Sequence, residues 1–264
     1  MIFDTHAHYL DHRFDEDRPK IISSFSENGI GHVTEVSAST DDFDDIINII
    51  NEYDFMYGTL GVHPSEVDKL TEDHMNRIIQ LSEHERIVAV GEIGLDYHFD
   101  DDPEPSVQKE WFIKQIEVAK KLNMPVIIHS RDAAKDTYDI LKKYHRGDGE
   151  KPDEGFAGGV IHCFSYSKEM ALEFVKMGYY IGLDGPVTFK NAKNAKEVAA
   201  SVPIDRLVVE TDCPYMAPEP VRGTKNSSLN LKYIIAEIAK IREVPYEEME
   251  DILYNNALAL YNLK

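Results

Sequence analysis

The stretch Ile87-Val88-Ala89-Val90-Gly91-Glu92-Ile93-Gly94-Leu95-Asp96 starts with four apolar residues and continues into a glutamate between two glycines. The apolar run predicts a buried strand over residues 87–92 that carries the Glu92 carboxylate at its end. Gly91 and Gly94 are expected to let the backbone turn tightly there. A glutamate beside glycine is common in itself. It gains significance here because other predicted strands of the chain also end in histidine or aspartate.

Short apolar runs that predict strands recur along the chain, and helical patterns alternate with most of them. Strands are expected at residues 1–6, 32–38, 56–62, 87–92, 125–129, 159–162, 179–183 and 206–212, and helices around residues 21–25, 46–50, 72–84, 106–122, 138–141 and from about 229 onward. Residues 145–159 predict a mobile surface loop. No hairpin turn pairs these strands, so we expect α/β architecture, a parallel sheet closed as a (β/α)8 TIM barrel, with residues 1–264 as one domain.

A doubly wound open sheet is the alternative fold, but no glycine-rich dinucleotide loop follows an early strand. The chain of 264 residues is 42% hydrophobic, which is ample for a packed core. No apolar run approaches the ~20 residues that cross a bilayer, and the N-terminus lacks the features of a signal peptide. We therefore expect a cytoplasmic protein without membrane association. For the same reason we expect no disulfide between Cys163 and Cys213.

The charge balance limits the partners. The chain has 48 acidic residues against 28 Lys and Arg, a formal net charge of −20. Such a charge disfavours an extended surface for a nucleic-acid duplex. It leaves room for a local site in which divalent cations and a few basic side chains hold one phosphate group.

Side chains that bind metals gather at the predicted strand ends. They are His6, His8, Glu92, His129, His162 and Asp212. His6 and His8 are two residues apart, so on an extended backbone both imidazoles point to the same side. In a barrel the carboxyl ends of the strands converge on the face that holds the active site. Histidines with carboxylates suit Zn²⁺ or Mn²⁺, and the carboxylates also suit Mg²⁺.

Six ligands exceed the need of one tetrahedral ion, so we expect two divalent metal ions. His6 and His8 are expected to share one ion with Asp212, while His129 and His162 hold the other. Glu92 is expected to bridge the two ions with its two oxygens. In some barrel hydrolases a carboxylated lysine is the bridge, but no lysine ends a predicted strand here.

Several motifs, in order along the chain, resemble those of the TatD-type metal-dependent deoxyribonucleases of the amidohydrolase superfamily. They are Asp4-Thr5-His6-Ala7-His8, Gly61-Val62-His63-Pro64, Gly91-Glu92-Ile93-Gly94-Leu95-Asp96-Tyr97, His129-Ser130-Arg131-Asp132-Ala133, His162-Cys163-Phe164-Ser165 and Glu210-Thr211-Asp212-Cys213-Pro214-Tyr215. Arg222-Gly223-Thr224-Lys225-Asn226 resembles the late family motif. It continues as Ser227-Ser228, where the family commonly has an acidic residue and proline.

The resemblance implies a (β/α)8 fold, a divalent-metal site and hydrolysis of phosphodiesters, typically as a 3′-to-5′ exonuclease on DNA. The six residues named above fall on the family's ligand positions. His63 and Glu210 fall on positions associated with substrate or metal. Single-stranded DNA or a DNA 3′ end is then the expected substrate, and no obligate protein partner is indicated.

We expect a metal-activated water to attack phosphorus, with Glu92, Asp212 and His63 as catalytic residues. Asp212 is the expected proton acceptor, because it can reach both an ion and the attacking water. His63 could donate a proton or hydrogen bond to a phosphate oxygen or the leaving group, or be structural.

Basic and aromatic residues after the strand ends supply the candidate substrate contacts. Arg131, Arg222 and Lys225 are candidate phosphate clamps. Tyr97 and Tyr215 could stack on a base or pack at the rim.

Two other functions remain open from the sequence. One is an amide or lactone hydrolase for a small metabolite on the same scaffold, because a fold does not determine a substrate. The acidic balance favours it, while the specific motifs and the basic group at Arg222 and Lys225 disfavour it. The other is a non-catalytic nucleic-acid or protein-binding module with a degenerate site, which the complete ligand set disfavours.

Overall fold

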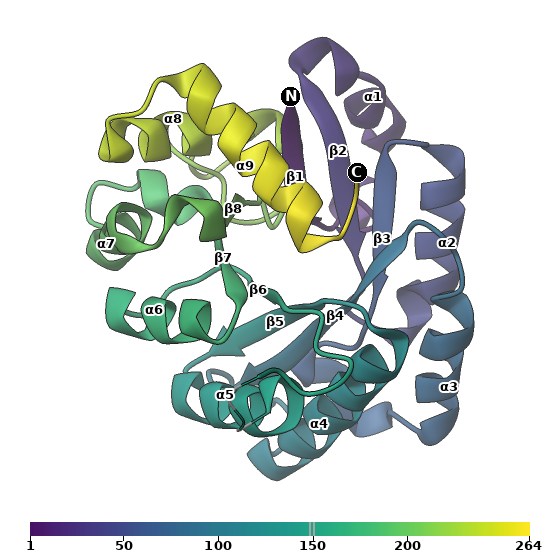
Figure 1. Cartoon of the computed structure of the whole chain (residues 1–264). Coiled ribbons are helices and arrows are strands. Elements are labelled where there is room, and N and C mark those ends of the chain that lie inside the picture. The colour runs from purple at the N-terminus through teal and green to yellow at the C-terminus, as the bar shows by residue number, and fades with distance from the viewer. Residues whose placement is uncertain (148, 150) are drawn as a thin grey trace.

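The chain folds as a barrel of parallel strands surrounded by helices (Figure 1). The computed structural model describes residues 1–147, 149 and 151–264. The strands are β1 (Ile2–Ala7), β2 (Ile30–Val36), β3 (Met56–Leu60), β4 (Ile87–Asp96), β5 (Val126–Arg131), β6 (Gly159–Ile161), β7 (Tyr179–Leu183) and β8 (Leu207–Val209). Each pairs in parallel with its neighbour along the chain, in the order β1 to β8.

The barrel closes between the start and the end of this order. Ala7 forms a parallel bridge with Cys213, and the Asp212 N–H donates to the His6 carbonyl at 3.0 Å. This closure brings the ends of β1 and β8 together, so residues some 200 positions apart become neighbours. The (β/α)8 prediction is confirmed. Cys163 and Cys213 are free thiols, as expected.

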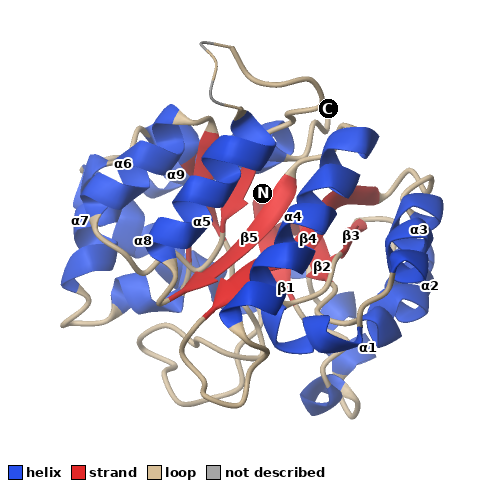
Figure 2. Ribbon diagram, turned by 90° about the horizontal axis from the view of Figure 1, so that it is seen from below, coloured by secondary structure: helices blue, strands red, loops and turns tan. Residues whose placement is uncertain are grey.

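Helices cover the outside of the barrel, as the view from below shows (Figure 2). They are α1 (Arg18–Ser23), α2 (Phe43–Glu52), α3 (Glu72–Leu81), α4 (Pro105–Leu122), α5 (Ala134–Ile140), α6 (Lys168–Lys176), α7 (Lys193–Ser201), α8 (Leu231–Arg242) and α9 (Tyr246–Leu260). Helices α6 and α7 were not predicted individually. Of the predicted loop 145–159, residues 148 and 150 lie outside the described residues, while His145 belongs to a π-helical turn (Leu141–Arg146) that continues α5.

Apolar side chains inside the barrel form a core of their own. Phe3, Val88, Ile127, Val160 and Val208 pack together there. Helix α9 crosses one end of the barrel (Figure 1). It contributes apolar side chains to the same core. A larger apolar layer lies between the strands and the outer helices. The interior is therefore filled, and the polar site is confined to the carboxyl ends of the strands.

Strand β4 differs from its prediction in length and in the role of its glycines. It continues past Glu92 to Asp96, and it contains no tight turn. Gly94 has φ +151°, and a Cβ there would lie 1.9 Å from the His129 carbonyl oxygen. At Gly91 a Cβ would lie 2.6 Å from the Cβ of Ile127. The two glycines therefore let β4 approach β5 closely instead of turning the chain.

Candidate metal centre

The first group of candidate ligands forms where the barrel closes. His6 lies on β1 and His8 just beyond it, and their Nε2 atoms are 3.0 Å apart. The Asp212 Oδ1 atom lies 3.7 Å from the first of these nitrogens and 3.5 Å from the second. The ring of His8 is held by its Nδ1–H, which donates to the Val36 carbonyl at 2.9 Å. This leaves Nε2 as the atom of His8 that faces the cluster.

Glu92 lies at the centre of the site. Its Oε1 is 2.8 Å from Nδ1 of His129 and 2.8 Å from Nε2 of His162. Its Oε2 faces the other way, 3.4 Å from Nε2 of His6 and 3.8 Å from Nε2 of His8. Each carboxylate oxygen thus faces one pair of histidines, as a bridging ligand would.

The electrostatic surroundings keep the central carboxylate ionised. Burial acts to raise the pKa of Glu92, but the surrounding histidines, His162 foremost, outweigh this effect and hold the pKa well below its usual range. The donor atoms of His6, His8 and Asp212 lie within 4.8 Å of one another, and so do those of His6, Glu92 and His162. This set of imidazoles and carboxylates fits borderline divalent ions.

Asp96 belongs to the site although the sequence analysis did not select it. Its Oδ2 accepts a hydrogen bond from Nε2 of His129 at 3.1 Å, and its Oδ1 accepts the His98 N–H at 2.8 Å. The side chain of Gln108 on α4 bonds to both the N–H and the carbonyl of Asp96, at 2.8 and 2.7 Å. Asp96 thereby orients His129 so that Nδ1 points toward Glu92.

His63 lies at the edge of the cluster. Its Nε2 is 4.0 Å from Oε1 of Glu92, and its ring meets that of His129 edge-on, with the centroids 4.3 Å apart. The Ser65 N–H donates to Nδ1 at 3.2 Å, so the proton of the neutral ring lies on Nε2, the atom that faces the cluster. Burial, and to a lesser extent the charge of His129, lowers the pKa of His63 to about 3, so the ring is neutral.

Glu210 is placed differently from the expected substrate contact. Its side chain is fully buried, and it lies 3.6 Å from Nδ1 of His162. It also accepts a hydrogen bond from the Cys163 N–H. A group without exposed surface cannot touch a bound substrate, so Glu210 stabilises His162 and the chain that follows it.

A second buried carboxylate, that of Asp4, stabilises the contact between β1 and the end of β8 that closes the barrel. Oδ2 of Asp4 accepts hydrogen bonds from the hydroxyls of Thr211 and Ser228, both at 2.6 Å, and burial raises the pKa of Asp4 to about 7. Ser228 lies in the segment where the chain departs from the late family motif. Asn226 also faces inward, donating to the Thr211 carbonyl at 2.9 Å. This segment therefore supports β1 and the end of β8.

The three candidate phosphate clamps are exposed, and each contacts a neighbour outside the six-residue cluster. The guanidinium carbon of Arg131 lies 4.9 Å from the Phe99 ring centroid, and that of Arg222 lies 4.2 Å from the Phe189 ring centroid. Nζ of Lys225 lies 2.6 Å from a carboxylate oxygen of Asp17. Their role toward phosphate stays a prediction.

The two candidate stacking tyrosines have different surroundings. The Tyr97 hydroxyl donates to Asp136 on α5 at 3.0 Å, and its ring packs against the core. Tyr215 is exposed on the loop after β8, beside the metal centre. Phe99, two residues after Tyr97, is also exposed. Tyr215 and Phe99 are therefore the accessible aromatic residues on these loops.

A (β/α)8 barrel with histidines and carboxylates gathered at the carboxyl ends of its strands is typical of metal-dependent hydrolases. The TatD related DNase family matches residues 3–262, and the chain belongs to this family. It is 41% identical over 263 residues to the uncharacterized metal-dependent hydrolase YabD of Bacillus subtilis, covering 100% of both chains. It is 33% identical over 268 residues to the uncharacterized metal-dependent hydrolase YcfH of Escherichia coli, covering 100% of this chain and 96% of the relative.

The fold agrees with that of a solved relative. The crystal structure of YjjV, a TatD homologue from Escherichia coli, superimposes with a TM-score of 0.90 at 30% identity, covering 100% of this chain and 98% of the other. No helix among the described residues is long and apolar enough to span a membrane.

Proposed function

We propose that the chain is a deoxyribonuclease that hydrolyses single-stranded DNA from its 3′ end with two divalent ions, Zn²⁺, Mn²⁺ or Mg²⁺. One observation carries the two-ion assignment. The two oxygens of Glu92 face separate histidine pairs, at 2.8 Å on one side and 3.4 and 3.8 Å on the other. The family match supports DNA as the substrate.

The ligands divide around Glu92. His6, His8 and Asp212 would hold one ion, and His129 and His162 the other. Ions bound in such a site activate a water molecule and neutralise charge on the phosphate group. The Val36 carbonyl orients His8 for this, and the Asp96 carboxylate orients His129.

Asp212 would accept the proton of the attacking water. Burial acts to raise its pKa, but His8, His162 and His6 outweigh this effect and lower it, so the carboxylate is ionised. Its side chain is 18% exposed, in contrast to the buried Glu92, and so is accessible from the mouth of the barrel. A carboxylate with this access can take a proton from an attacking water.

His63 would donate a hydrogen bond to the substrate. It is neutral, and its Nε2–H faces the cluster. A donor there can bind a phosphate oxygen or the departing 3′ oxygen, while Ser65 holds the ring.

A time course on 5′-labelled single-stranded DNA tests the proposal. The oligonucleotide is incubated with Mg²⁺, Mn²⁺ or Zn²⁺, or with EDTA. We expect a ladder that shortens from the 3′ end and is abolished by EDTA. Folded protein that leaves the oligonucleotide intact with every metal, but turns over a panel of lactones or acyl amides, would favour the small-molecule hydrolase.

A further inference from the structure

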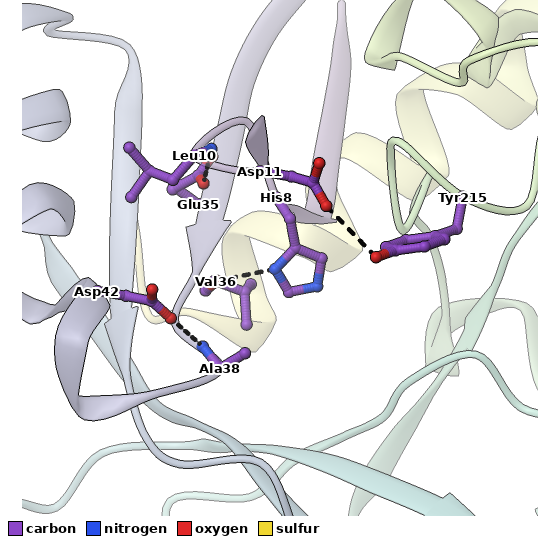
Figure 3. A pocket seen from close by; sticks show the side chains of 8 residues that line it. All are labelled: His8, Leu10, Asp11, Glu35, Val36, Ala38, Asp42 and Tyr215. Carbon is purple, nitrogen blue, oxygen red and sulfur yellow. Dashed lines mark hydrogen bonds between the residues drawn. The ribbon is translucent and has the colours of Figure 1, made fainter. Parts of the chain in front are cut away.

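A pocket of about 240 Å³ opens beside the metal centre. His8 lies between Tyr215 on one side and Val36 and Ala38 on the other (Figure 3). Because His8 is also a candidate metal ligand, the pocket begins where the cluster ends. A substrate whose phosphate is held at the cluster would extend directly into this space.

The carboxylates that line the pocket already have hydrogen-bond partners. Glu35 accepts two backbone N–H bonds at 2.8 Å each, and Asp42 accepts two at 2.9 and 2.8 Å. Asp11 accepts hydrogen bonds from the Arg13 guanidinium and from the Tyr215 hydroxyl, the latter at 3.3 Å. These groups shape the walls and are not arranged as a cation site. The surfaces left for a ligand are the imidazole, the aliphatic side chains and the tyrosine ring.

Tyr215 presents a fixed aromatic surface at the mouth of the pocket. The residue is 49% exposed. The guanidinium carbon of Arg13 lies 3.9 Å from its ring centroid, and Asp11 accepts a hydrogen bond from its hydroxyl group. A large aromatic group held in place yet open to solvent is typical of surfaces on which nucleic-acid bases stack.

The size of the pocket limits what it can hold. A volume of about 240 Å³ corresponds to roughly eight water-sized groups and falls below the ~300–1,000 Å³ of sites that enclose a whole drug-sized ligand. One flat heterocycle fits this space, and a base pair does not. For a nucleic-acid strand, one base would occupy the pocket while the rest of the strand lies outside.

We propose that the pocket between His8 and Tyr215 binds the unpaired base of the 3′-terminal nucleotide, stacked on Tyr215, while the phosphate of that nucleotide lies at the metal centre. This assignment rests on the deoxyribonuclease function proposed above. It explains how a chain of net charge −20 recognises a single strand, since stacking contributes binding that does not depend on a basic surface.

Two oligonucleotides that differ only at the 3′ end test the proposal. One ends in dA, and the other ends in a tetrahydrofuran unit that lacks a base. The quantity measured is the ratio of kcat/KM for removal of the last unit, dA over abasic, with the metal that supports activity. For the wild-type protein we expect a ratio of about ten or more. Tyr215→Ala should bring the ratio toward one, and Tyr215→Phe, which keeps the ring, should retain it.

Two further variants serve as comparisons. Tyr233→Ala removes a tyrosine on α8 that also has a cation near its ring, with Nζ of Lys232 at 5.2 Å, and should keep the wild-type ratio. Phe99→Ala removes the 50% exposed aromatic residue on the loop after β4 and should also keep it. Circular dichroism checks that each variant is folded.

The possible failures are distinguishable. If the wild-type protein removes both ends at equal rates, the base does not bind in a pocket, and the nuclease function stands without this proposal. If Phe99→Ala lowers the ratio and Tyr215→Ala does not, the base binds at the loop after β4 and the proposal is wrong. If neither oligonucleotide is shortened, the deoxyribonuclease function itself fails, and this proposal fails with it.

Discussion

Replacing Asp96 by asparagine removes the charge from the group that orients His129. The carboxylate accepts a hydrogen bond from Nε2 of His129 at 3.1 Å, and Asp96 is almost fully buried. A hydrogen bond to a charged group is worth about 1.5–3 kcal/mol, which corresponds to a factor of roughly 10–100 in an equilibrium constant. Carboxylates behind metal-binding histidines show effects of the same size, about 10- to 100-fold. We therefore expect Asp96→Asn to weaken binding of one ion by about that factor.

Metal titration against a competing chelator measures this effect, with steady-state hydrolysis beside it. Asp100→Asn is the matched control, because Asp100 is exposed in the loop that follows the same strand. Two ions bound by Asp96→Asn with wild-type affinity would refute the orienting role. Complete loss of one bound ion would instead indicate that Asp96 is itself a ligand. His63 and His129 would then be its partners, because the donor atoms of these three residues lie within 4.8 Å of one another.

Glu92→Gln should reduce the bound metal below two ions and lower hydrolysis by at least about 100-fold, because the bridging carboxylate is lost; full metal content with full activity would disprove the two-ion assignment. Gly94→Ala should destabilise the fold by about 3 kcal/mol or more in urea unfolding, because its φ is +151° and the new Cβ would lie 1.9 Å from the His129 carbonyl oxygen. Gly223→Ala is its control, with φ +86° and no atom within 4 Å of the new Cβ. Burial, and to a lesser extent the charge of Lys120, lowers the pKa of His145 to about 3. Between about pH 6.5 and 3 the unfolded state therefore binds a proton that the folded state does not bind. Stability should therefore be lost as the pH falls from about 6.5 toward 3, by up to about 1.4 kcal/mol per pH unit, and His145→Gln should lose less over the range where both proteins remain folded. Parallel pH dependences for the two proteins would contradict this reasoning.

Local patterns of apolar and polar residues predicted most of the fold. Apolar runs alternating with helical patterns predicted all eight strands, although their ends differ by a few residues. Strand β4 shows why the ends are harder to predict. Glycines at 91 and 94 are compatible with a turn or with an extended strand, and only the approach of β5 decides between them.

The six candidate metal ligands were predictable because each follows or ends an apolar run. Asp96 could have been found by the same logic, since Glu92, Gly94 and Asp96 alternate along one side of an extended strand. Asp96 was not selected because the strand was predicted to end at residue 92, whereas it continues to Asp96. Glu210 could not have been placed correctly from the sequence. Its burial depends on contacts with His162 and the Cys163 N–H, which no local pattern predicts.

Periodicity depends on neighbouring residues along the chain. Sequence patterns alone were therefore enough to predict the class of fold, the chemical types of the candidate ligands and the strands that carry them. The tertiary structure decided which oxygen of Glu92 faces which histidines, which carboxylates are buried, and where the pocket beside His8 lies. These features depend on distances between β1, β4 and the loop after β8. Such distances exist only once the barrel closes and brings together residues that lie far apart in the sequence.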